Sequence, residues 1–149
     1  MTKPGQKIED PNTEDTALMD SQRKWVCGHY APETEHQYHT ITGKLNLLDT
    51  ILRQKWIAPA ETVKLQCLGI ALGDALAQQL GMKWVAVEDE LGRSPALWLE
   101  GTTIILFPHT MISKRIERGD GVDVYELFND LCGKVGELKK ELTELPPAT

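Results

Sequence analysis

Cysteine and histidine side chains gather between residues 27 and 39 of the chain. Thiolate and imidazole groups are the ligands that zinc prefers, and four of them can close a tetrahedral structural site. The set would be Cys27, His29, His36 and His39. A single residue separates Cys27 from His29, whereas paired ligands in structural zinc sites are usually about two to four residues apart. The spacing therefore favours a chance cluster in a polar loop and a chain without a cofactor, with zinc as the alternative.

Acidic residues and an arginine flank a predicted hairpin turn. Glu88 and Asp89 precede the turn and Arg93 follows it. Paired carboxylates can divide the roles of general acid and general base when their environments separate their pKa values. Both carboxylates at a hairpin tip would normally be solvated, so the pattern favours a charged loop braced by a contact between Asp89 and Arg93.

Two further groups complete the catalytic candidates. Asp74 lies in an apolar stretch, where a buried carboxylate needs a partner, and we predict an ion pair with Lys114 or Arg115. His109 follows Pro108 at the predicted end of a strand, without a nucleophile elbow, a phosphate loop or a second motif that would complete a triad. A structural role is therefore favoured for each. The catalytic candidate set is Asp74, Glu88, Asp89, Arg93 and His109.

Large aromatic and basic side chains are the candidates for binding. Trp84 and Trp98 lie in predicted strands, where an uncovered sheet face would present them to a partner. Lys114 and Arg115 form a small basic patch that could hold an anion or an acidic partner. Acidic residues follow closely in the sequence, so a solvated helix face is the simpler interpretation of this patch.

Two helices are predicted ahead of the strands. Residues 41–56 place apolar side chains at helical spacing, and a second helix covers residues 60–80. Apolar side chains surround most of the second helix, which is typical of a central helix. Small residues recur at every fourth position along it, which predicts a flat stripe where another backbone approaches closely. They are Gly69, Gly73 and Ala77.

Three short runs rich in β-branched and aromatic residues then predict strands, over residues 83–87, 96–99 and 103–107. Gly92 and Gly101 supply the positive φ that tight turns need, and short loops force antiparallel neighbours. Apolar residues fall on both faces of the predicted sheet. We expect helices to cover both faces, with one exposed, partner-binding face as the alternative.

Two more helices follow the strands, over residues 111–118 and from a cap at Asp123 to about residue 142. The predicted fold class is therefore α+β: N-terminal helices, a three-stranded antiparallel meander, and C-terminal helices packed on the sheet.

The predicted domain organisation is simple. Residues 1–16 carry little that can be buried, so they are expected to form a flexible arm. Residues 17–145 form a single domain that begins with a short helix, and residues 62–142 are its best-defined part. Residues 146–149, which include two prolines, form a tail.

The stretch LGIALGDALAQQLGMKWVAVEDELGRSPALW, followed by IILFPHTMISKRIERGDGVDVYELF, resembles a bacterial family catalogued as domain of unknown function 3806. The resemblance covers roughly residues 68–131. It is carried by Leu72-Gly73-Asp74, Glu88-Asp89 with Gly92-Arg93, and Phe107-Pro108 with Lys114-Arg115. It implies a bacterial origin and supports the α+β order, and it implies no established activity or catalytic residue.

Composition narrows the class of function. The 149-residue chain has a net charge of −6, which argues against a nucleic-acid partner or an anionic membrane surface as partner. No apolar run approaches the roughly 20 residues that span a bilayer, and no secretory signal precedes the domain. Three cysteines in no framework spacing are typical of reduced thiols. We therefore expect a cytoplasmic protein.

The sequence favours a non-catalytic protein whose partner is another protein, because no catalytic motif is complete. Small acidic bacterial proteins of this size are often immunity proteins that neutralise secreted toxins, and this analogy rests on the type of protein alone. The alternative is a small hydrolase or ligand-binding domain that uses the Asp, Glu, Arg and His candidates at the sheet. That alternative requires those side chains to converge on one pocket.

Overall fold

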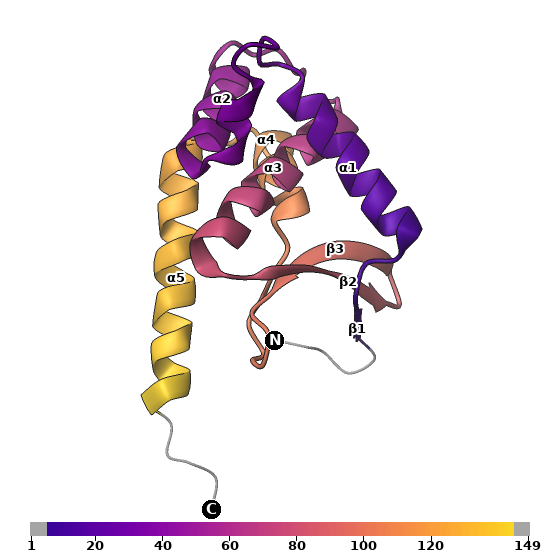
Figure 1. The fold of residues 1–149 in the computed structure, drawn as a ribbon, viewed down its shortest axis with the longest axis vertical. Helices are drawn as coiled ribbons and strands as arrows, with labels where there is room; N and C mark the ends of the chain where they lie inside the picture. The colour runs from indigo at the N-terminus through magenta and orange to yellow at the C-terminus, as the bar shows by residue number, and fades with distance from the viewer. Residues whose placement is uncertain (1–5, 145–149) are drawn as a thin grey trace, which may run out of the picture.

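The computed structural model describes residues 6–144. A four-stranded antiparallel sheet in the order β1-β2-β3-β4 lies beneath a layer of helices (Figure 1). The strands are β1 (Lys7–Glu9), β2 (Lys83–Asp89), β3 (Gly92–Trp98) and β4 (Ile105–Leu106). The helices are α1 (Thr13–Cys27), α2 (Ile41–Arg53), α3 (Thr62–Leu80), α4 (Met111–Glu117) and α5 (Val124–Glu144), with short 3₁₀ helices η1 (Glu35–His39) and η2 (Pro108–Thr110). The α+β class and the antiparallel meander are confirmed.

The fourth strand comes from the N-terminus. Residues 1–16 were expected to form a flexible arm. In the described part of that segment, β1 pairs antiparallel with β2, with Ile8 opposite Val87. Residues 1–5 of the expected arm and the expected tail (residues 146–149) lie outside the described residues. Helix α1 begins inside the same segment, where Asn12 and Asp15 form a capping box. The sheet edge supplies hydrogen-bond partners to a segment that has little apolar surface of its own, which is why hydrophobic patterning does not reveal this strand.

Helix α3 is the centre of the helical layer. It packs against α1, α2, α4, α5 and η2, and it ends at Gly81, which has a left-handed φ of 67°. The predicted small-residue stripe is confirmed. A Cβ on Gly69 would lie 2.3 Å from the carbonyl oxygen of His109, and one on Gly73 would lie 2.3 Å from the Trp84 ring. The chain at η2 can therefore run directly across α3.

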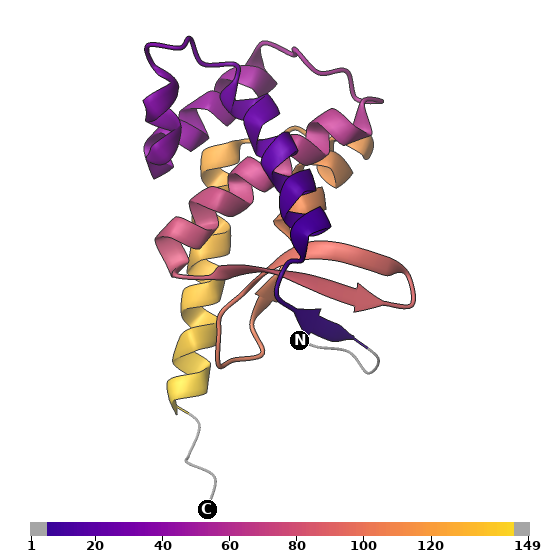
Figure 2. The same cartoon turned by 45° about the vertical axis from the view of Figure 1, so that its right-hand side comes forward.

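The two faces of the sheet have different surroundings. Figures 1 and 2 show helices α1 to α4 together on one side of the sheet, while α5 descends past its end. The expectation that helices cover both faces is therefore wrong. On the outer face, a second apolar cluster of Val85, Val87 and Ala96 is flanked by partly buried side chains, among them Trp98. Alternation along β2 and β3 puts these groups opposite the core-facing Trp84 and Leu97.

Strand β4 pairs only with Leu97 and Trp98, so the rest of β3 is an open edge. Pro95 lies in that edge, where a missing N–H removes no ladder hydrogen bond. Among the described residues, no helix is long and apolar enough to cross a membrane.

Candidate functional site

Asp74 is the centre of a buried polar network, which we call the Asp74 hub: Asp74, Arg23, Tyr38 and Trp84. Arg23 of α1 donates from Nε to Oδ2 at 2.6 Å and from Nη2 to Oδ1 at 2.9 Å. The Tyr38 hydroxyl and the Trp84 indole N–H each donate to the carboxylate at 2.9 Å. Four hydrogen bonds use the four lone-pair positions of a carboxylate, so no acceptor position is left for a substrate proton.

The predicted partner of Asp74 was wrong. Lys114 is exposed, and Arg115 donates to the carbonyl oxygen of Met111 within its own helix. Arg23 replaces them because α1 packs across α3 at the level of Asp74. Burial raises the pKa of the Tyr38 hydroxyl, which keeps that group protonated and donating to the carboxylate.

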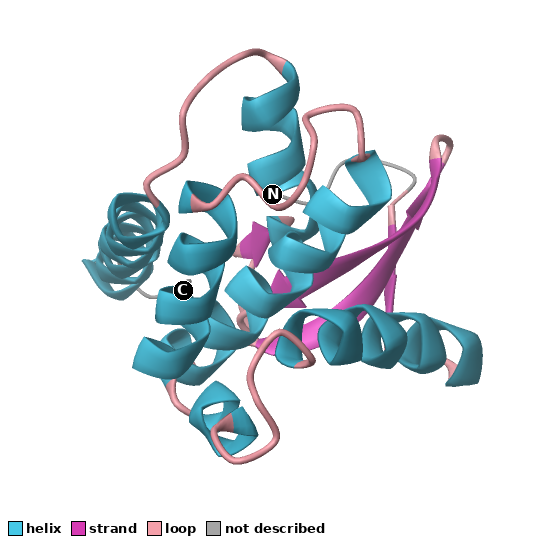
Figure 3. Cartoon of the chain, turned by 90° about the horizontal axis from the view of Figure 1, so that it is seen from above, coloured by secondary structure: helices cyan, strands magenta, loops and turns pink. Residues whose placement is uncertain are grey.

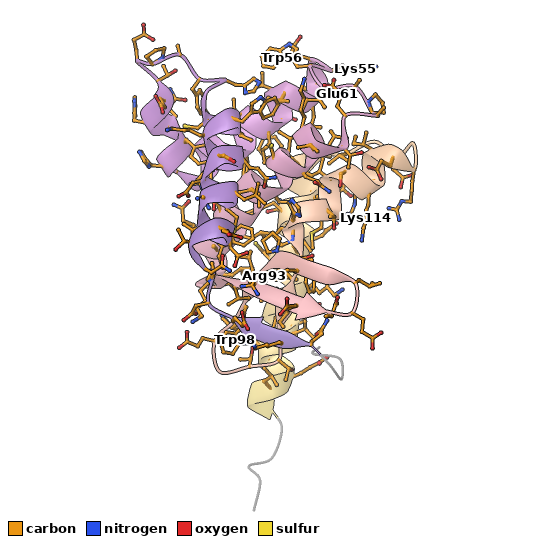
Figure 4. All side chains as sticks on the ribbon, turned by 90° about the vertical axis from the view of Figure 1, so that its right-hand side faces the viewer. Lys55, Trp56, Glu61, Arg93, Trp98 and Lys114 are labelled. Atoms are coloured by element: carbon orange, nitrogen blue, oxygen red, sulfur yellow. The ribbon has the colours of Figure 1, made fainter. Side chains whose placement is uncertain are left out.

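A second charged cluster joins the N-terminal segment to the sheet, and we call it the Arg93 clamp: Arg93, Asp15 and Glu9. Arg93 donates to Asp15 from Nη2 at 2.7 Å and to Glu9 from Nη1 at 2.9 Å. Figure 4 shows Arg93 where the lower end of α1 meets the strands. Hydrogen bonds from Arg93 are the main reason why the pKa of Asp15 lies below its usual range. Arg93 therefore fastens β1 and α1 to β3, and it does not brace Asp89 as predicted.

The turn between β2 and β3 presents a different group, the hairpin tip (residues 88–92). Asp89 pairs with Gly92 across a two-residue turn, and its Oδ1 accepts the Leu91 N–H at 2.8 Å. Gly92 has a φ of 128°, a backbone conformation that residues with a side chain rarely adopt. Leu91 is 98% exposed, and Glu88 and Glu90 beside it are exposed as well. Figure 3 shows the two strands, in magenta, reaching past the helices to this turn.

His109 lies beneath α1 in a cavity of about 60 Å³, the α1 pocket. Of the other catalytic candidates, Arg93 also lines the pocket. Asp74, Glu88 and Asp89 do not line it. The His109 Nε2 atom is buried without a hydrogen-bond partner, and burial lowers the pKa of the imidazole. The full lining is Pro11, Asp15, Leu18, Met19, Gln22, Val85, Ala86, Arg93, Ser94, Pro95 and His109.

Two of the proposed zinc ligands, Cys27 and His29, point to different neighbours. The Cys27 thiol lies 3.6 Å from Glu35, and burial raises its pKa, which disfavours the thiolate that zinc requires. The His29 Nδ1 atom faces the carbonyl oxygens of Trp25 and Val26, while its ring stacks on Trp56. Over residues 6–144, no group of three or more His, Cys, Asp or Glu side chains could hold a metal ion.

The tryptophans predicted to bind a partner lie in separate places. Trp84 belongs to the Asp74 hub, inside the main core. Trp98 lies on the outer face, where its indole N–H donates to the Thr102 carbonyl at 2.7 Å and Lys83 lies over its ring. Figure 4 shows Trp98 beside the strands and Lys114 higher, on the helical layer, so these candidates do not form one surface.

Sequence reasoning missed Leu91, Gln22 and Asp15. Leu91 carried a signal, since an apolar residue inside a run of acidic turn residues has no core to join. The sequence contained no such signal for Gln22 and Asp15, because the surroundings of both residues depend on how α1 crosses the sheet.

Comparisons with known proteins agree with this fold. No curated protein matches the chain. A crystal structure of a protein from Bacteroides thetaiotaomicron is similar, with a TM-score of 0.69 at 14% identity over 88% of this chain and 48% of that one. The chain thus spans about half the length of that neighbour, and the likeness shows the fold alone. The model of the family described as domain of unknown function (DUF3806) matches residues 44–128, more than half of the chain. The chain therefore belongs to the DUF3806 family.

Proposed function

We propose that the protein is a non-catalytic interaction protein that binds a basic partner protein through the hairpin tip. The observation that carries the proposal is the 98% exposure of Leu91 at a turn whose neighbouring side chains, Glu88, Asp89 and Glu90, are all acidic. An apolar side chain inside an acidic rim matches a partner surface that has an apolar hollow ringed by Lys and Arg. The net charge of −6 favours the same partner at longer range.

The tip is held in one shape before any partner arrives. The Asp89 side chain bonds to the Leu91 N–H, seven residue pairs join β2 to β3, and the Arg93 clamp fixes the strand just after the turn. A preorganised loop loses little conformational entropy on binding, so more of the contact energy appears as affinity.

The hydrogen bonds and ion pairs that engage the catalytic candidates support a non-catalytic role. All four acceptor positions of Asp74 are used, Arg93 is held by two carboxylates, and Asp89 bonds within its own turn. A hydrolase needs an acid or base within hydrogen-bond reach of a shared substrate, and these side chains serve three separate places in the fold.

A secreted cationic toxin would have the basic surface described above. The biological role of the protein would then be to neutralise that toxin. We place the protein in the bacterial cytoplasm as part of the same proposal. Co-expression with such a toxin would then restore growth, and the Leu91→Asp variant would fail to do so.

The direct test places a photo-crosslinking amino acid at position 91 in the organism that encodes the chain. Position 63 is the matched control, because Val63 is 67% exposed on α3, in a different element. We expect one basic protein to crosslink from position 91 and not from position 63. Equal crosslinking from both positions would contradict the proposal.

Affinity measurements with the captured protein complete the test. Leu91→Ala should weaken binding about tenfold, because roughly 1.4 kcal/mol of buried apolar surface is lost. Replacing Glu88 and Glu90 by Gln should slow association and flatten its salt dependence, while Val63→Ala should change neither quantity. Unchanged affinity for Leu91→Ala would rule out the hairpin tip as the anchor.

A further inference from the structure

The α1 pocket contains two uncharged polar side chains that the fold leaves without partners. Gln22 is only 9% exposed, no hydrogen bond joins its amide to another residue in the described range 6–144, and solvent still reaches the amide. The Nε2 atom of His109 is fully buried and also lacks a partner. Buried polar groups in native proteins are almost always paired with protein, ordered water or a ligand. Gln22 and His109 both line this cavity, so a single guest can contact both residues.

The rest of the lining defines the shape and polarity of such a guest. Leu18, Met19, Ala86 and Pro95 make most of the wall apolar. A cavity of about 60 Å³ holds a few heavy atoms, since roughly 10–15 Å³ admits one water. The guest is therefore small, with an apolar side against the wall and a polar end toward Gln22 and His109.

Charge in the pocket argues for a neutral guest. Arg93 and Asp15 are the charged residues of the lining, and they are paired with one another. Glu9 also binds Arg93, so this corner carries two carboxylates for one guanidinium. An anion would meet excess negative charge, and a cation would have to compete with Arg93 for the same carboxylates. Burial lowers the pKa of His109, which keeps the imidazole neutral as well.

We propose that the α1 pocket binds a primary carboxamide group. The Gln22 amide can pair with it through two hydrogen bonds, one donated and one accepted, and His109 Nε2 supplies a third. The carboxamide comes either from a free small amide or from the side chain of a peptide glutamine. This site is separate from the hairpin tip, so each proposal stands or fails alone.

The test uses three planar molecules of nearly the same shape: acetamide, acetate and acetamidinium, which are neutral, anionic and cationic. Each is titrated into the ¹⁵N-labelled full chain while the His109 ring and Gln22 side-chain resonances are followed by NMR. Acetamide should shift both sets saturably, with a dissociation constant no tighter than roughly 40 μM for so small a molecule. Acetate and acetamidinium should bind at least about tenfold more weakly.

A peptide arm distinguishes the two sources. The probe is glutamine whose backbone amino and carboxyl groups are blocked. If it competes with acetamide and binds more tightly, the natural guest is a peptide glutamine side chain. If acetamide binds and blocked glutamine does not compete, the guest is a free amide. Gln22→Met, which keeps the side-chain length, should weaken acetamide binding about tenfold. The matched control is Gln37→Met, because Gln37 is exposed in η1 and does not line the pocket.

Three results would overturn the proposal: no saturable shift at Gln22 and His109, equal shifts from all three molecules, or a site that holds water only. The comparison of three ligands on the unmodified chain keeps the test valid even if Gln22→Met fails to fold.

Discussion

Asp74 shows how a carboxylate can look catalytic in the sequence and serve the structure instead. Its side chain is 12% exposed and joins α1, η1 and β2 to α3 through Arg23, Tyr38 and Trp84. Lys44, also buried, lies over the Tyr38 ring and bonds to Gln78 beside the same network. A fully paired polar network of this kind specifies one packing arrangement, because any shift leaves a buried charge unpaired.

Replacing Asp74 by Asn should therefore destabilise the protein by about 3 kcal/mol. The figure is at the lower end of the range for broken buried pairs, since Arg23 is 28% exposed and water can reach it. Tyr38→Phe removes one neutral donor and should cost about 1 kcal/mol. Urea denaturation measures both changes.

Asp20→Asn is the matched control, because Asp20 pairs with the same Arg23 but is 61% exposed. Its expected effect is below about 0.5 kcal/mol. If Asp74→Asn proved as mild as Asp20→Asn, the hub would not hold the elements together.

At the scale of elements, the glycines of α3 set how closely neighbouring segments approach. Gly69 faces the backbone of His109, and Gly73 faces the Trp84 ring, which the hydrogen bond to Asp74 holds in place. Neither neighbour is the loose end of a flexible side chain. The stripe therefore fixes where η2 and β2 lie on the central helix.

Gly73→Ala should destabilise the protein by about 2 kcal/mol. The added methyl group gains up to about 1 kcal/mol in helix propensity, but overpacking against a fixed ring outweighs that gain. Gly133→Ala in α5 is the matched control, because a Cβ there meets nothing within 4 Å. It should stabilise the protein by up to about 1 kcal/mol, and thermal unfolding of both variants tests the contrast. A neutral or stabilising Gly73→Ala would show that Trp84 can move aside.

At the scale of the whole molecule, the N-terminal segment is tied to a sheet that follows much later in the chain. Residue Ile8 pairs with Val87, and Asp15 and Glu9 both bind Arg93. These contacts fasten the N-terminal segment to the sheet, and two of the residues that make them, Asp15 and Arg93, also line the α1 pocket. Local stability in this region therefore depends on charges as well as on apolar burial.

Stability should fall in two steps as the pH is lowered. Burial lowers the pKa of His109 from 6.5 in the folded state, so the unfolded chain binds a proton at this imidazole more tightly. The free energy of unfolding therefore declines as the pH falls from 6.5 to the folded-state pKa. The pKa of Asp15 is lowered from 3.8, so the contribution of the Arg93 clamp is complete above pH 3.8 and is lost below it. His109→Gln should remove the first step, which urea denaturation on both sides of pH 6.5 would detect. An unchanged first step in that variant would assign it to other groups, and exposed His36→Gln is the control.

The sequence by itself determined the features that depend on neighbours in the chain. Helix periodicity and caps predicted α2, α3 and α5, and Asp123 does accept the backbone N–H groups of Tyr125 and Glu126. Glycines at turns predicted the tight connections, and Gly81, Gly92 and Gly101 all have positive φ. Spacing alone also predicted the close approach along α3. These signals are readable because backbone sterics and hydrogen bonds act over a few residues.

Only the tertiary structure decided which distant groups meet. Asp74 bonds to Arg23, which is 51 residues away in the sequence, and Arg93 bonds to Asp15, which is 78 residues away. No sequence pattern predicts pairing over such separations. Strand β1 exists because β2 offers an edge, and the Gln22 and His109 polar groups are left together because α1 crosses the sheet there. Long-range pairing depends on the geometry of the assembled core, so both the saturation of Asp74 and the α1 pocket were decided by packing.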